Sequence, residues 1–248
     1  MHRLPLSIAL LTLATVSQAA PDTRFARCTE FVGVAPVALA AAQALVPPRY
    51  TLVAPGGQAQ LVVRVADCAE VQVGRQPARP GRVAQIGVII ASPDGTATDP
   101  ATSINNYTLT YASNSPALVT ALRAAGVPAV LDAGLVIETH PVAGGQEFYA
   151  AVSPELNLAP AWFLHGTVQT PSVPTSFLAN WWRLNGRAET KMATTIPLIS
   201  FDFASSVSFT TTRQGAVGSL LAGNQVAGFP LSFRGAFDLG TMVTSVSR

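Results

Sequence analysis

Few side chains in this sequence are suited to covalent or acid–base chemistry, and they lie far apart along the chain. Lys191 is the only lysine, and Arg187 lies close before it. A neighbouring cation lowers the pKa of a lysine amine, so this pair would suit Schiff-base chemistry with a carbonyl compound. The alternative is that Lys191 and Glu189 form a polar pair on an amphipathic strand.

Glu138, His140 and His165 are the other candidates. Glu138 and His140 would share one face of a strand, where they would form an acid–base pair or, with His165 from a later strand, part of a metal site. A catalytic zinc needs three protein ligands, and the sequence contains no His-x-His or His-x-x-Glu-His cluster. Gly-x-Ser-x-Gly, GxGxxG and P-loop motifs are also absent. We therefore predict no catalytic residue, no metal site and no cofactor.

The elements that position these residues are clearest in the middle of the chain. Residues 107–112 alternate β-forming and apolar side chains. Ser115 is a good N-cap, Pro116 suits the first helical position, and Gly126 is suited to the position after the helix. A strand is then predicted over residues 129–140, which carries Glu138 and His140. The order is strand, short helix, turn, strand.

Strands are predicted over most of the remaining chain. Glycines 144 and 145 join residues 135–142 and 146–153 into a β-hairpin. Further strands are predicted at residues 50–54, 60–66, 71–74, 83–92, 161–169, 177–183, 188–197, 199–212 and 229–246, and short helices at 36–46 and 216–222. No repeat of 20–50 residues occurs. The pattern predicts a mainly β (α+β) fold, with a curved or closed antiparallel β-barrel-like sheet and three short helices.

The order of parts in the middle of the chain resembles the core of acetoacetate decarboxylase-like proteins. In that family a Tyr-led strand and a polar loop precede a short helix, which closes with Gly-aromatic-Pro-Lys-Lys. Residues 45–52 resemble the family's approach to its first strand, and residues 60–65 the hydrophobic strand after it. Residues 82–88 resemble its Tyr-x-Glu-hydrophobic strand, with Gln85 at the position of the active-site glutamate. The resemblance covers roughly residues 43–140.

This resemblance implies a pocket without the family's reaction. The family reaction needs a lysine that forms an imine with a keto acid. Gly126 and Pro128 match the family motif, but Ala129 and Val130 stand at its two lysine positions. Hydrocarbon side chains cannot form an imine, so the pocket has to be interpreted for binding or for other chemistry.

The first residues are typical of an export signal. His2 and Arg3 precede a mostly apolar run over residues 4–16, which is shorter than a membrane span, and Ser17-Gln18-Ala19 suits a signal peptidase. Cleavage after Ala20 is the alternative. We expect a signal peptide at residues 1–19, a single domain at residues 20–248 in a secreted or periplasmic protein, and no integral membrane segment after cleavage.

The charge balance bears on the possible binding partners, and the two cysteines bear on the cellular compartment. Without Arg3 the chain has 14 basic and 13 acidic residues, and its arginines are scattered, so no nucleic-acid partner is expected. Cys28 and Cys68 are predicted to form a disulfide in an oxidising compartment, since their spacing suits neither a metal site nor a redox pair. On the chain-entropy model this bridge would stabilise the fold by roughly 4 kcal/mol.

Trp181 and Trp182 are two of only three tryptophans. Neighbouring strand residues face opposite ways, so one indole should enter the core or a cavity. The leading hypothesis is an exported, non-catalytic protein that binds a small, largely apolar molecule in a barrel cavity, with Tyr111, Glu138, Trp181 and Trp182 as the ligand-binding residues. The alternatives are an enzyme of unknown reaction that uses Glu138, His140 and Lys191 in the same cavity, and a structural envelope domain. The oligomeric state is left open.

Overall fold

The computed structural model describes residues 20–143, 145–152, 162–168, 173–211, 216–221, 225–227, 229 and 231–248. Its strands are β1 Thr23–Ala38, β2 Gln58–Val73, β3 Arg79–Ile89, β4 Ser103–Ser113, β5 Ala129–Leu131, β6 Val136–Val142, β7 Gly145–Val152, β8 Trp162–Val168, β9 Thr175–Asn185, β10 Ala188–Thr211, β11 Gln225–Ala227 and β12 Leu231–Ser247. Its α-helices are α1 Leu39–Leu45, α2 Pro116–Ala124 and α3 Ala216–Leu220, and a 3₁₀ helix spans Pro55–Gly57. The predicted signal peptide lies outside the described residues. None of the helices in the described ranges is long and apolar enough to cross a membrane.

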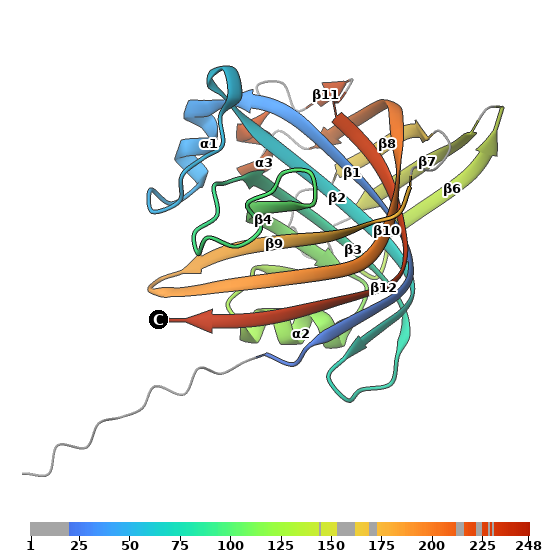
Figure 1. Cartoon of the computed structure of the whole chain (residues 1–248), viewed down its shortest axis with the longest axis horizontal. Helices are drawn as coiled ribbons and strands as arrows, with labels where there is room; N and C mark the ends of the chain where they lie inside the picture. The colour runs from blue at the N-terminus through green and yellow to red at the C-terminus, as the bar shows by residue number, and fades with distance from the viewer. Residues whose placement is uncertain are drawn as a thin grey trace, which may run out of the picture.

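Seven of the strands form a closed barrel in the order β12-β1-β2-β3-β4-β9-β10, and a pairing between β10 and β12 completes the circle (Figure 1). The predicted mainly β architecture, with a curved or closed barrel-like sheet and three short α-helices, is thus confirmed, and the sheet is closed. Most pairings are antiparallel, but β4 pairs with both β9 and β5 in parallel. Closure places each of these seven described strands between two neighbours, so none of them is an edge strand of an open sheet.

The alternation of side chains along each strand produces two separate cores. On β2, Leu61, Val63 and Val65 belong to an outer core that includes Phe148 of β7. Val62 and its same-face neighbours belong to an inner core that draws side chains from all seven barrel strands. A period of two in the sequence therefore decides which residues line the barrel interior.

The outer core lies between the barrel and a smaller sheet. The 24-residue strand β10 pairs with β9 and β12 along its first part and with β8 along its last part. The smaller sheet extends from β8 through β7 to β6. The rings of Phe31 in β1 and Phe148 in β7 stack with their centroids 3.8 Å apart across this interface. The predicted hairpin of β6 and β7 is confirmed, although residue 144 in its turn lies outside the described residues.

The helix α2 fills one end of the barrel interior. The Ser115 side chain accepts a hydrogen bond from the Leu118 amide, and Gly126 after the helix has a φ of +82°. Leu118, Val119 and Leu122 are buried in the inner core. The helix predicted from its cap, its proline and its glycine is confirmed.

Several predicted boundaries differ from the structure because strand pairing overrides local signals. The helix predicted at 36–46 begins at Leu39, since β1 stays paired with β2 as far as Ala38. The strand predicted at 129–140 is divided into β5 and β6 by a turn in which the Gly134 amide donates to the Asp132 side chain. The strand predicted at 50–54 is reduced to one bridge between Leu52 and Ile90.

Candidate functional site

A pocket of about 700 Å³ opens at the barrel end opposite α2. Strands β1, β3, β4, β9, β10 and β12 contribute its apolar wall, which includes Val34, Ile89, Ile104, Phe177, Phe201 and Phe233. We call it the open-end pocket. A volume of this size, with mostly apolar walls, is within the range of small-molecule sites.

Three phenylalanines form one side of the open-end pocket. The Phe201 ring meets Phe177 edge-on at a centroid distance of 5.4 Å and Phe233 at 4.9 Å. All three rings are half-buried. Edge-to-face contact is a favoured geometry for aromatic pairs, and the three rings together form a continuous apolar surface.

Residues 91–103 form the rim of this pocket, and we call them the rim loop. Ala97, Thr98, Pro100 and Ala101 of this loop line the pocket. The Asn105 amide nitrogen donates to the Ala97 carbonyl at 2.8 Å, which ties the loop to β4. The pocket therefore has a fixed rim on this side.

Lys191 holds the rim loop from outside the barrel. Its ammonium donates to the Asp94 carboxylate at 2.6 Å and to the Thr96 hydroxyl at 2.8 Å, and it lies 5.0 Å from the centre of the Trp182 ring. Burial would raise the pKa of Asp94, but hydrogen bonds from Lys191 and Thr96 outweigh it and lower that pKa to about 2. Asp94 is therefore ionised at neutral pH, and Lys191 is engaged in an ion pair with it outside the barrel.

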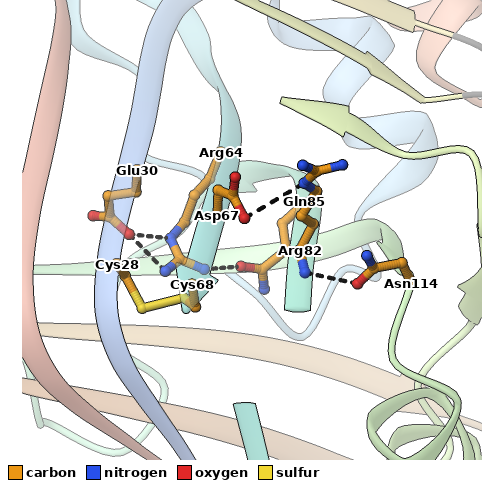
Figure 2. Close-up of a disulfide and its surroundings, with 8 residues drawn as sticks. All are labelled: Cys28, Glu30, Arg64, Asp67, Cys68, Arg82, Gln85 and Asn114. Carbon is orange, nitrogen blue, oxygen red and sulfur yellow. Dashed lines mark hydrogen bonds and ion pairs between the residues drawn. A yellow bond between two sulfur atoms is a disulfide. The ribbon is translucent and has the colours of Figure 1, made fainter. Parts of the chain in front are cut away.

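A buried polar chain runs along the inner face of three neighbouring strands of the barrel wall (Figure 2). Nη2 of Arg64 lies 2.6 Å from Oε2 of Glu30, and Nε of the same guanidinium donates to that oxygen at 2.8 Å. Nη1 of Arg64 donates to the side-chain oxygen of Gln85 at 2.6 Å. The chain links β1, β2 and β3 and lies beside the Cys28–Cys68 disulfide. The presence of this disulfide confirms the predicted bridge.

A small cavity of about 30 Å³ lies next to the open-end pocket, and we call it the inner cavity. Ile104, Phe177 and Phe233 line both spaces and separate them. Glu30, Arg64, Asn106 and Thr194 contribute polar side chains to the inner cavity. Asn106 is fully buried, and neither atom of its amide group has a hydrogen-bond partner.

Two of the predicted ligand-binding residues lie inside the barrel. Trp181 is buried and lines the inner cavity, where its ring lies against Gly87. Tyr111 is also buried in the inner core, and burial raises the pKa of its phenol despite the nearby Arg64 guanidinium. Tyr111 is not among the described residues that line the two cavities.

Trp182 and Glu138, the other two, lie outside the barrel interior; for Trp182 this agrees with the expectation that only one of the two indoles faces inward. Trp182 faces the outer core because it alternates with Trp181, and its indole donates to the Asn105 side-chain oxygen at 3.0 Å. Glu138 is on the small outer sheet, where its side chain is 55% exposed and lies 3.5 Å from His140. The barrel wall separates this carboxylate from the interior.

The structure does not assemble the alternative catalytic set. Glu138 and His140 share a face of β6 as predicted, but both are exposed, and Lys191 lies on the outer face of β10. The backbone of His165 pairs with Tyr149 in β7, while its side chain lies outside what the structure describes. Within the described residues, no group of three His, Cys, Asp or Glu side chains is placed to hold a metal.

Two positions derived from the family resemblance are buried at the α2 end. Ala129 is 3% exposed and belongs to the inner core, beside its register partner Tyr111. Val130 is 8% exposed. Both side chains lie in packed surroundings, away from the open-end pocket.

The polar residues of the barrel interior were missed by sequence reasoning, apart from Gln85. Arg64 carried a usable signal, because it is the one charge in an apolar run and shares a face with Val62 and Ala66. Asn106 carried no such signal in the sequence. A register shift in β4 brings both Asn106 and Tyr111 inside, although strict alternation would place them on opposite faces.

No protein-family model and no curated protein sequence matches this chain. Solved structures do resemble it. The enduracididine biosynthesis enzyme MppR in complex with pyruvate has a TM-score of 0.58 at 14% identity, covering 98% of this chain and 96% of that one. An acetoacetate decarboxylase-like enzyme from Sphingomonas wittichii RW1 also has a TM-score of 0.58, at 12% identity and 96% coverage of both chains.

The acetoacetate decarboxylase of Legionella pneumophila is similar as well. Its TM-score is 0.55 at 11% identity, covering 99% of this chain and 92% of that one. Likeness at this level of identity establishes the fold and leaves the activity open. The chain therefore has the acetoacetate decarboxylase-like fold that its strand–helix–strand core predicted.

Proposed function

We propose that this chain is an exported, non-catalytic protein that binds a small, largely apolar molecule in the open-end pocket. The observation that carries the proposal is the pocket of about 700 Å³, lined by half-buried aromatic and aliphatic side chains. Leaving apolar surface exposed to water is unfavourable, and covering it with a ligand recovers that free energy. The residues that contact the ligand in this proposal are Ile89, Ile104, Phe177, Phe201 and Phe233.

The lack of a free amine supports a binding role. Decarboxylation through an imine needs an uncharged lysine beside the substrate. The only lysine of the chain is ion-paired with Asp94, and it is not among the described residues that line either cavity. Ala129 and Val130 match the family's lysine positions in sequence. Reduction with borohydride in the presence of pyruvate should therefore leave the protein mass unchanged, and an adduct on Lys191 would favour the enzymatic alternative.

Export is supported by the N-terminal segment and by the disulfide. Disulfides persist mainly in oxidising compartments, and the Cys28–Cys68 bridge joins paired positions of β1 and β2. We expect the protein recovered from outside the host cytoplasm to begin at Ala20. N-terminal sequencing tests this, and a chain that retains residues 1–19 would contradict it.

Binding is tested with an uncharged apolar dye such as Nile red. We expect saturable binding with one dye per protein chain. Ile89→Trp places an indole in the open-end pocket and should abolish binding. Val243→Trp is the matched control, because Val243 is 48% exposed and is not among the described residues that line either cavity. Equal binding by both variants, or no binding by the unmodified protein, would favour a structural domain instead.

A further inference from the structure

The inner cavity has features that packing alone does not explain. It lies directly beyond the side chains of Ile104, Phe177 and Phe233, which also line the open-end pocket. A ligand in that pocket therefore needs to displace only these side chains to reach it. Its volume of about 30 Å³ leaves room for a water molecule or a hydroxyl group.

Asn106 is the polar group in this cavity that lacks a partner. Its side chain is 0% exposed, yet neither the amide nitrogen nor the amide oxygen is hydrogen-bonded. Its chain neighbour Asn105, by contrast, bonds to the rim loop and accepts from Trp182. Burying an unpaired amide is unfavourable, and such groups in folded proteins usually have a partner. The carboxamide can both donate and accept, so its best partner is a group that does the same.

The charges around the inner cavity are already balanced. Glu30 and Arg64 form an ion pair at 2.6 Å, and their side chains are only 4% and 11% exposed. A charged group that entered the cavity would bring an unpaired charge into a buried site. The cavity therefore selects against carboxylates and amines.

We infer that the ligand is an apolar molecule that ends in an uncharged hydroxyl group, and that this hydroxyl enters the inner cavity and exchanges hydrogen bonds with Asn106. The hydrocarbon part lies on Phe177, Phe201 and Phe233 in the open-end pocket. This inference rests on the proposed binding function and adds the chemical class of the ligand to it.

Three probes of equal chain length test the inference: octanol, octanoate and chlorooctane. Each is titrated against the protein with bound Nile red, and displacement is measured by fluorescence. Octanol should bind about tenfold more tightly than chlorooctane, which lacks the hydroxyl hydrogen bonds. Octanoate should bind at least tenfold more weakly than octanol, because its charge would be buried without a partner.

Asn106→Leu has nearly the same shape and removes both polar atoms. In this variant octanol should bind no better than chlorooctane, while Nile red binding stays within about twofold of the unmodified protein. The probe series in the unmodified protein tests the inference independently of this variant. Circular dichroism of the Asn106→Leu variant is the control for folding, and we expect the same spectrum as for the unmodified protein.

The outcomes separate the two proposals. If octanoate matches octanol, or chlorooctane matches octanol, the inference is overturned and the inner cavity holds only water. If Asn106→Leu leaves the preference for octanol intact, Asn106 is not the recognition group and the inference also fails. If neither Nile red nor any probe binds, the proposed function itself fails.

Discussion

The two ends of the barrel are lined by the same kind of strands, yet one end is filled and the other is open. At the α2 end, Leu118 and Leu122 are fully buried against Tyr111. At the other end Phe177 and Phe233 remain half-buried around the open-end pocket. Between the two ends the Glu30–Arg64–Gln85 chain lies on the inner face of β1, β2 and β3.

The connections between strands explain this difference. The connection after β4 contains an amphipathic helix, whose apolar face fills the interior beneath it. The connection before β4 is the rim loop, and residues 92–103 contain only small or polar side chains and prolines. Such a loop can form a rim but cannot fill a cavity. A barrel of this fold is therefore opened or closed by what its loops supply.

The largest predicted effect concerns the polar chain between the two ends. Arg64→Met leaves the Glu30 carboxylate buried without a partner and should lower the free energy of unfolding by about 3–5 kcal/mol, measured by urea denaturation. Arg27→Met is the control. The Arg27–Glu70 pair is exposed, so that change should cost about 0–1 kcal/mol. If the two costs were equal, the barrel middle would be more open to water than its burial indicates.

The next effect contrasts the packing of the two ends. Leu122→Ala at the filled end should cost about 2–5 kcal/mol, because it leaves a cavity in a packed core. Ile104→Ala at the open end should cost about 1–2 kcal/mol, because Ile104 is half-buried beside space that is already empty. Urea denaturation of both variants measures the difference. A larger cost for Ile104→Ala would mean that the open end is packed.

The smallest effect concerns the rim of the open end. The pKa of Asp94 is lowered to about 2 from its usual 3.8, so the ion pair contributes its stability fully above about pH 4 and loses it as the pH falls towards 2. Lys191→Met removes the cation and should raise this pKa towards 3.8, measured by NMR titration of the Asp94 carboxyl group. An unchanged pKa would show that Lys191 does not hold the rim loop in solution.

Local signals in the sequence were enough for part of the fold. Ser115, Pro116 and Gly126 marked α2 because caps and breakers act within a few residues. The predicted start of α1 at residue 36 was wrong, because the pairing of Ala38 with Gln58 depends on a partner strand distant along the chain. A curved or closed sheet was expected from the number and spacing of the strands. Neither the β10–β12 pairing that closes it nor the parallel pairing of β4 with β9 carried a local mark.

The candidate site was less predictable than the fold. The alternation rule separated Trp181 from Trp182 correctly but did not indicate which one faces inward. Glu138 was predicted as a ligand-binding residue because it is a carboxylate close to a histidine on one strand face. Its side chain is exposed on the outer sheet. Asn106 and Tyr111 both face inward because of a register shift between β3 and β4, which no pattern in the sequence reveals.

The most direct test of the account is a crystal structure of the protein with octanol that carries bromine on its terminal carbon. We expect anomalous density for the bromine in the open-end pocket, against Phe177, Phe201 and Phe233. Bromine located only on the outer surface, or no bound bromine when the probe is in large excess, would contradict the claim that the open end of this barrel holds an apolar ligand.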